Sequence, residues 1–155
     1  MTRSVCVIDT SVFCNMLGIP NMDDKQQVVF GRLRDLTKTN ATFVLPVATI
    51  LETGNHIGQL PDGRLRWEKA RRLVKRVTEA IGGEAPWVTG MNIDSTVLKK
   101  WLDGFPENAK KGMGIADASI IEEWKELCES HRGWRVFIWS LDAHLQGYDR
   151  APEMG

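Results

Sequence analysis

The chain has 155 residues, 43% of them hydrophobic and 26% charged, as is typical of one compact domain with a sizeable core. Twenty basic residues balance twenty acidic ones, so the net charge argues neither for nor against a nucleic-acid partner. Three cysteines with no Cys-x-x-Cys spacing argue against a disulfide framework or a zinc site, and they favour a reducing cytoplasm. We expect a single domain over residues 1–155, with no secretory signal and no membrane-spanning run.

Strand-like and helical patterns alternate along the first half of the chain. Val5 to Ile8 predicts a buried strand that ends abruptly in Asp9, Thr10 and Ser11, and a helix follows it. A second helix carries an apolar stripe at spacings of four and three, and a strand over Thr42 to Leu45 comes after it. Pro46 suits the start of a third helix, which places Glu52 on its polar side.

The clearest amphipathic pattern is a helix from about Leu65 to Ile81. Its predicted buried stripe is formed by Trp67, Ala70, Val74, Val77 and Ile81. The opposite face carries three basic side chains that could track an RNA backbone, and they are Lys69, Arg72 and Arg76. A solvated face whose charges pair along the helix explains the same residues equally well.

The second half continues the alternation. Trp87 to Met91 predicts a strand, and a short helix follows through Leu98 and Trp101. A polar connection from Gly104 to Gly114 then holds two further candidate RNA contacts, Lys110 and Lys111. The next helix, near Ile115 to Ser130, has an acidic outer face formed by Glu122, Glu123, Glu126 and Glu129. Val136 to Trp139 predicts the last strand, and we expect residues 145–155 to form a loose tail.

Strands separated by helices imply parallel pairing through right-handed crossovers. The sequence therefore predicts an α/β fold, with three layers and a central parallel sheet of four to five strands. In such a sheet, the functional site lies outside the carboxyl ends of the strands.

Four carboxylates occupy positions that point to such a site. Asp9 and Asp142 each follow a predicted strand, Asp117 lies on the apolar stripe of its helix, and Glu52 lies on the helix after the second strand. Taken singly, Asp117 could simply stabilise the N-terminal end of its helix, and Glu52 could simply belong to a solvent-exposed polar face. Four acids at one edge would repel one another unless a cation neutralised them. Mg²⁺ or Mn²⁺ takes such oxygen ligands and promotes phosphodiester cleavage.

At these positions the chain resembles the PIN-domain ribonucleases, and most closely the VapC-type toxins of toxin–antitoxin pairs. Four stretches carry the resemblance, in the order in which the family has them: Val7 to Val12, Leu45 to Glu52, Gly114 to Ile121 and Trp139 to Leu145. Ser140 stands where many members have threonine, which keeps the hydroxyl. The segment from Gly82 to Lys111 is longer than the family pattern.

The resemblance implies a PIN-like fold and a Mg²⁺- or Mn²⁺-dependent endoribonuclease. It also implies RNA as the substrate, pairing as a homodimer, and inhibition by a cognate antitoxin. Under this hypothesis the catalytic residues are Asp9, Glu52, Asp117 and Asp142. Asp9, Asp117 and Asp142 bind the metal, while Thr10 and Ser140 hydrogen-bond the carboxylates. For Ser11, ordinary helix capping is the preferred interpretation.

Three alternatives are compared with this interpretation. A haloacid-dehalogenase-like phosphatase needs a second acid two residues after Asp9, where this chain has Ser11. A phosphorylation receiver domain needs an acid pair at the first strand and a lysine after a late one, and neither is present. The serious rival is a PIN-like module that binds RNA or protein without catalysis. The retention of all four acids favours an enzyme.

Overall fold

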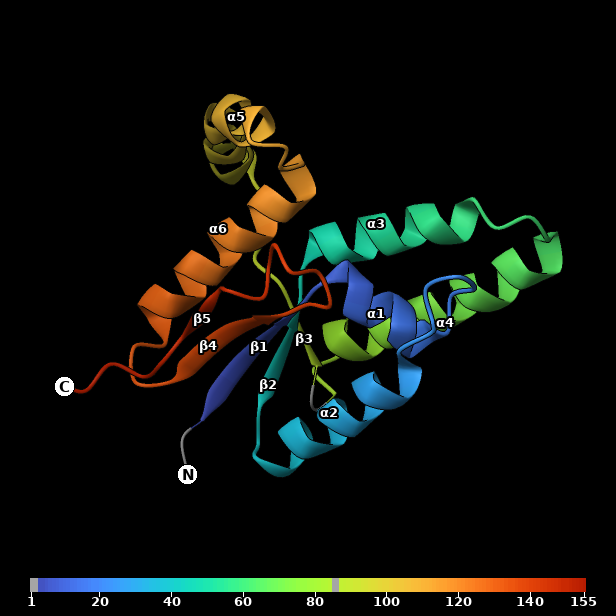
Figure 1. Ribbon diagram of the computed structural model, residues 1–155, viewed down its shortest axis with the longest axis horizontal. Coiled ribbons are helices and arrows are strands. Elements are labelled where there is room, and N and C mark those ends of the chain that lie inside the picture. Colours follow the sequence, from blue (N-terminus) through green and yellow to red (C-terminus); the bar gives the residue numbers. More distant parts are fainter. Residues whose placement is uncertain (1–2, 85–86) are drawn as a thin grey trace.

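The computed structural model describes residues 3–84 and 87–155, in which helices cover both faces of one sheet (Figure 1). The strands are β1 (Ser4–Ile8), β2 (Thr42–Leu45), β3 (Trp87–Thr89), β4 (Arg135–Trp139) and β5 (Asp149–Arg150). The helices are α1 (Thr10–Leu17), α2 (Gln26–Lys38), α3 (Val47–Gly58), α4 (Gly63–Ile81), α5 (Ser95–Lys110) and α6 (Ile115–Ser130). The predicted three-layer α/β fold is confirmed.

The sheet has the strand order β3-β2-β1-β4-β5. The first four strands are parallel to their neighbours, whereas β5 is an antiparallel edge strand that pairs with β4. The prediction of four to five strands is therefore confirmed, and the sheet is mixed at its β5 edge. The register of β1 and β4 sets Ile8 beside Trp139, so these two strands end together.

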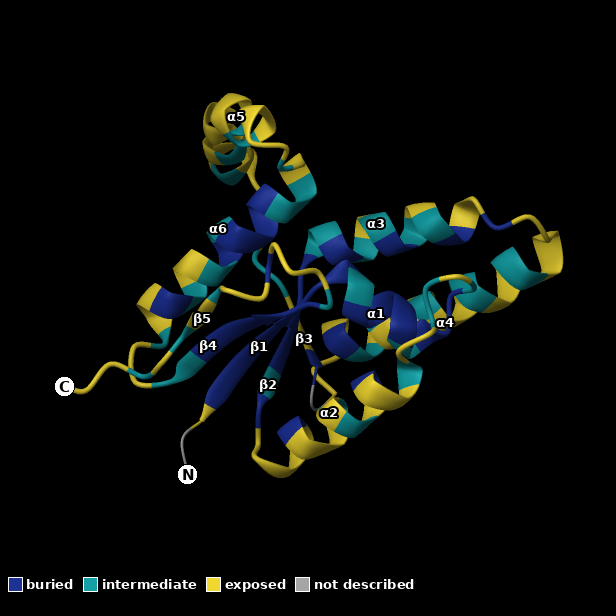
Figure 2. Ribbon diagram, viewed as in Figure 1, coloured by how far each residue is buried: buried dark blue, intermediate teal, exposed yellow. Residues whose placement is uncertain are grey.

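Alternation along β1 divides the core in two. Cys6 and Ile8 face the larger cluster, which includes residues of α1, α2 and β2. Val5 and Val7 face the opposite side and pack against residues of α6 and β4. A strand covered on both faces is almost entirely apolar, and all five residues of β1 are buried, with Ser4 as its one polar member. Figure 2 shows the sheet as the most buried layer of the molecule.

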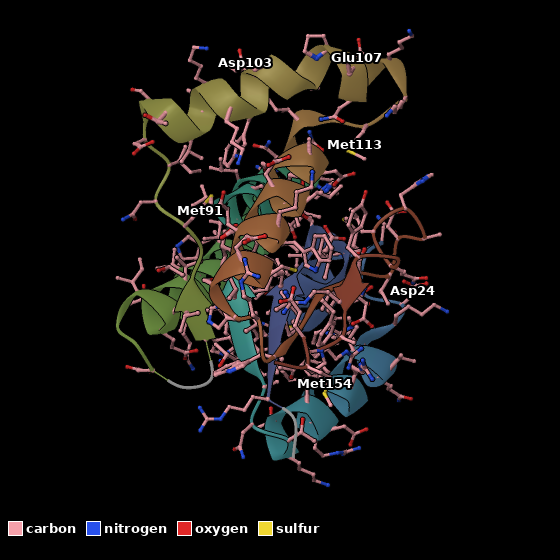
Figure 3. The ribbon with its side chains drawn as sticks, turned by 90° about the vertical axis from the view of Figure 1, so that its left-hand side faces the viewer. Asp24, Met91, Asp103, Glu107, Met113 and Met154 are labelled. Atoms are coloured by element: carbon pink, nitrogen blue, oxygen red, sulfur yellow. The ribbon has the colours of Figure 1, made fainter. Side chains whose placement is uncertain are left out.

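Helix α5 lies apart from both clusters. It has no buried residue and packs mainly against α6. Figure 3 shows it across the end of α6, with Asp103 and Glu107 marking its position. The expected loop from Gly104 to Gly114 is wrong in its first part, because α5 continues through Pro106 to Lys110. Asp94 caps its start by accepting a hydrogen bond from the Val97 N–H.

The expected loose tail is also wrong over residues 145–150. Leu145 is buried, and β5 pairs with Val136 and Phe137 of β4. The Arg150 guanidinium also donates hydrogen bonds to the carbonyl oxygens of Cys128, His131 and Trp134, at 2.7–2.8 Å. These contacts order the segment although its sequence has no strand-like apolar run.

The predicted stripe of α4 is only half correct. Ala70 and Val77 pack against the larger core cluster, together with Leu73. Trp67, Val74 and Ile81 point to solvent, with relative exposures of 61%, 62% and 71%. The face of α4 that packs against the core is formed by Ala70, Leu73, Val77 and Ala80, so it is rotated away from the predicted stripe. Ala80 is the residue of this helix that is buried.

Within residues 3–84 and 87–155, no helix combines the length and apolar character needed to cross a membrane.

Candidate active site

Asp9 and Asp142 lie at the same edge of the sheet because β1 and β4 are parallel neighbours. Asp9 follows β1 and caps α1, and its backbone N–H donates to the Trp139 carbonyl oxygen at 3.1 Å. Asp142 follows β4 by three residues and is exposed, whereas Asp9 is only 4% exposed. One acid is therefore built into the end of the sheet, and the other lies at its surface.

Glu52 and Asp117 reach this edge from helices on opposite faces of the sheet. The Thr10 hydroxyl donates to the Glu52 carboxylate at 2.8 Å, which joins the start of α1 to α3. Asp117 is half-buried in the first turn of α6. Burial, followed by the charges of Asp9, Glu52 and Asp142, raises the pKa of the Asp117 carboxyl to about 6. The structure thus brings the four predicted acids into one electrostatic cluster.

Two serine hydroxyls hold the Asp9 carboxylate. Ser11 and Ser140 donate to its Oδ2 atom at 2.8 and 2.7 Å. The same hydroxyls accept hydrogen bonds from the backbone N–H groups of Leu141 and Asp142, both at 2.9 Å. Each serine therefore links Asp9 to the turn after β4, and this network fixes the position of Oδ2. The Oδ1 atom accepts no hydrogen bond from the residues that the structure describes.

Within this network, Ser11 has a larger role than the sequence alone indicates. The expected capping role of Ser11 is wrong, because Asp9 caps α1 and accepts the Ser11 backbone N–H. The Ser11 hydroxyl instead reaches across to the turn after β4. The signal was present in the sequence, because Ser11 and Ser140 each follow a strand at the same sheet edge. The pairing of β1 with β4 brings the two hydroxyls to within 3.3 Å of each other, and the sequence does not reveal this pairing.

In the sequence Lys111 stands shortly before Asp117, whereas His144 has no spacing that suggests metal binding, and the structure places both beside Asp117. Together with Met113, they line a cavity of about 130 Å³ that includes Asp117. The charge of His144 opposes the rise in the Asp117 pKa. Both side chains follow turns, Lys111 after α5 and His144 after β4, so no helical or strand periodicity relates them.

The other candidate RNA contacts lie elsewhere. Arg72 donates to the Leu17 carbonyl oxygen at the end of α1, at 3.1 Å, and Arg76 pairs with Glu79 at 3.1 Å. Lys69 lies close to the same end of α1, near Gly18, which has a positive φ of 67°. Of the five predicted basic contacts, Lys111 is the one that lines a cavity with an acid of the cluster, and Lys110 adjoins it in the chain.

The donor chemistry of the cluster fits a hard divalent cation. The half-buried Asp117 carboxylate accepts no hydrogen bond from residues 3–84 and 87–155, although three other acids surround it electrostatically. An uncompensated carboxylate of this kind is stabilised by a cation. No three Asp, Glu, His or Cys side chains in these ranges converge closely enough to hold an ion as they stand. Binding would therefore require the acids to draw together.

The topology and the position of the acids define a three-layer α/β domain with an acidic edge at the carboxyl ends of its parallel strands. The chain is similar to the crystal structure of FitAcB from Neisseria gonorrhoeae, with a TM-score of 0.59 and 17% identity over 92% of this chain and 91% of that one. It is also similar to FitAB bound to an IR36 DNA fragment, with a TM-score of 0.58 and 16% identity over 92% and 89%. No protein-family model and no curated protein matches the sequence.

Proposed function

We propose that this protein is a divalent-cation-dependent endoribonuclease that acts as the toxin of a toxin–antitoxin pair. The observation that carries the proposal is the grouping of four carboxylates at the carboxyl edge of the sheet, where burial and the other three acids raise the pKa of Asp117. The acids would have to draw together to hold an ion. Such a cluster needs a cation, and a cation held by carboxylates suits phosphodiester hydrolysis.

The roles follow from the contacts of each acid. Asp9, Asp117 and Asp142 would hold Mg²⁺ or Mn²⁺, which supplies positive charge to phosphate oxygens and lowers the pKa of a bound water. Asp9 is suited to this role because Ser11 and Ser140 fix its Oδ2 atom and leave Oδ1 available. Glu52, oriented by the Thr10 hydroxyl, would orient the attacking water.

The proposed substrate is single-stranded RNA that enters beside Lys111. This side chain and His144 line the cavity next to Asp117 and supply cationic or polar contacts for a phosphate. Lys110 lies next to Lys111 and would extend this contact. Lys69, Arg72 and Arg76 remain candidate contacts for more distant phosphates, although Arg72 and Arg76 already bond within the chain.

The toxin part of the proposal draws on the structural neighbours. FitAB is a toxin–antitoxin complex whose FitB toxin has a PIN domain. A fold of the same type in this chain supports a toxin that pairs with a cognate antitoxin, whereas the proposed homodimer rests on the sequence resemblance alone. The sequence resemblance to VapC-type toxins leads to the same partners independently.

Catalysis is tested by incubating purified protein with end-labelled RNA in Mg²⁺ or Mn²⁺. We expect Asp9→Asn or Asp117→Asn to lower the cleavage rate by about a hundredfold or more, because each removes a charged ligand. The matched control is Asp103→Asn, since this exposed acid on α5 pairs with Lys99 away from the cluster. Circular dichroism melting would verify that all three variants fold.

Two results would reject the nuclease. One is equal cleavage by wild type and Asp117→Asn, which would indicate a contaminating activity. The other is RNA or protein binding without cleavage by a folded wild type in either metal. That second result would establish the alternative, a PIN-like binding module.

A further inference from the structure

Helix α4 has the apolar spacing of a helix that packs against another helix along its length. Positions 67, 70, 74, 77 and 81 alternate steps of three and four, which is the heptad spacing of a helix–helix seam. The fold uses only part of this seam. Ala70 and Val77 contact the core cluster, whereas Trp67, Val74 and Ile81 recur at steps of seven and are 61–71% exposed. Figure 2 shows α4 as intermediate or exposed over most of its length.

The exposed positions are not needed to anchor α4. Leu73 packs against the core cluster, and Ala80 is 4% exposed within it. The helix therefore has one apolar face that holds it to the domain and a second one with no cover among the described residues. Three large apolar side chains in one line favour an interaction surface over chance exposure.

The charged side chains beside Trp67, Val74 and Ile81 indicate which kind of partner could bind there. A surface groove of about 520 Å³ is lined by three cationic side chains, Arg71, Arg72 and Lys75, next to Trp67 and Val74, and no acid lines it. The two acids of α4 already have partners on the helix, since Glu68 pairs with Arg64 at 3.3 Å and Glu79 pairs with Arg76 at 3.1 Å. Arg71 lies over the Trp67 ring at 4.8 Å, and neither Arg71 nor Lys75 forms an ion pair within residues 3–84 and 87–155.

We propose that the outer face of α4, formed by Trp67, Val74, Ile81, Arg71 and Lys75, docks an amphipathic helix of a protein partner whose apolar stripe is edged with carboxylates. A partner helix would pack against the exposed apolar positions of α4, whose heptad spacing suits helix–helix packing. Carboxylates at its edges meet Arg71 and Lys75. None of the four acids of the candidate active site lines this groove, so the surface is separate from the proposed nuclease centre.

Two other occupants fit less well. A second copy packed antiparallel about Val74 would bring the two cationic grooves towards each other, and no acid lines either groove. RNA would find a stacking partner in Trp67, but Val74 and Ile81 are aliphatic and offer no aromatic face to a base.

The test uses a fluorescein-labelled synthetic helix of 19 residues, the length of α4, with leucines at steps of three and four and glutamates beside them. A second peptide carries lysines in place of the glutamates. By fluorescence anisotropy we expect the glutamate peptide to bind at least about tenfold more tightly than the lysine peptide. The difference should shrink at high salt, because screening weakens exposed charge pairs.

Val74→Asp and, separately, Ile81→Asp should weaken binding of the glutamate peptide by about tenfold or more. Val28→Asp is the matched control, because Val28 is equally exposed at 64% on α2 and receives the same charge. It should leave binding unchanged. Circular dichroism melting of each variant separates lost docking from lost folding.

The proposal is overturned if neither peptide binds, if both bind equally, or if Val74→Asp and Val28→Asp behave alike. It is also overturned if sedimentation shows a wild-type dimer that Val74→Asp dissociates, since a second copy would then cover the face. Binding of single-stranded RNA in EDTA that Val74→Asp abolishes would assign the face to nucleic acid instead.

Discussion

Asp9 shows how a single buried carboxylate is held in one orientation. Its Oδ2 atom accepts from two serine hydroxyls, and those hydroxyls in turn accept from two backbone N–H groups. Hydrogen bonds to a carboxylate are stronger than those between neutral groups, so this network holds the Asp9 side chain firmly. Asp117 lacks such donors among the described residues, and burial together with its acidic neighbours raises its pKa. The fold therefore orients Asp9 through hydrogen bonds and leaves Asp117 without them.

The protonation of Asp117 should make the stability of the metal-free protein depend on pH. Its pKa rises from the ordinary 3.8 to about 6 on folding, so the folded state binds more protons between these values. The contribution of Asp117 to stability is therefore fully present below pH 3.8 and is lost as pH rises through about 6. Urea unfolding in EDTA should show the free energy of unfolding of Asp117→Asn rising relative to that of the wild type between pH 3.8 and about 6. Above this range the difference between the two proteins should stay constant. A gap that does not change with pH would contradict the assignment.

At the scale of elements, the end of α6 is stabilised by a side chain from β5. The Arg150 guanidinium donates hydrogen bonds to the carbonyl oxygens of Cys128, His131 and Trp134. The first two lie at the C-terminal end of α6, where the helix macrodipole is negative. This one residue connects the last helix, the turn after it and the edge strand. The ordering of the chain after residue 145 thus depends on a long-range polar contact that no local sequence pattern encodes.

Arg150→Met should therefore destabilise the protein by about 2–3 kcal/mol, because several charged hydrogen bonds are lost while the aliphatic packing is largely kept. The measurement is the urea unfolding midpoint at constant slope. Arg132→Met is the control, since Arg132 is exposed and pairs with Glu129 at the surface. Its loss should cost less than about 1 kcal/mol. Equal effects of the two substitutions would show that the Arg150 contacts are not stabilising.

Local patterns in the sequence predicted the four parallel strands and the sheet edge at which the acids lie, because a buried parallel strand is apolar and polar residues follow its end. They did not predict β5. They failed where a residue's environment depends on a distant element. Glu123 was placed on a solvated face, but it is 5% exposed and accepts the Met91 N–H at 2.7 Å. Periodicity could not decide which side of α4 faces the core, because apolar residues line both sides.

The whole molecule joins four separate chain segments and two helix layers at the acidic edge, so ion binding there should be coupled to folding. A cation held by Asp9, Asp117 and Asp142 binds only when β1, β4 and α6 are assembled. Stabilisation by such a ligand is about 2.7 kcal/mol at a hundredfold excess over its Kd. For a domain of this size that corresponds to a rise of roughly 5–10 °C in Tm.

Thermal melting in EDTA and in millimolar Mn²⁺ measures this coupling. The wild type and Asp103→Asn should show the full rise, because Asp103 lies on α5 and outside the cluster. Asp117→Asn should melt higher than the wild type in EDTA above pH 6, since it removes the repulsion, and should gain little from Mn²⁺. The opposite signs of the two effects distinguish loss of a cation ligand from general destabilisation. An equal Mn²⁺ response in Asp117→Asn would place the cation elsewhere.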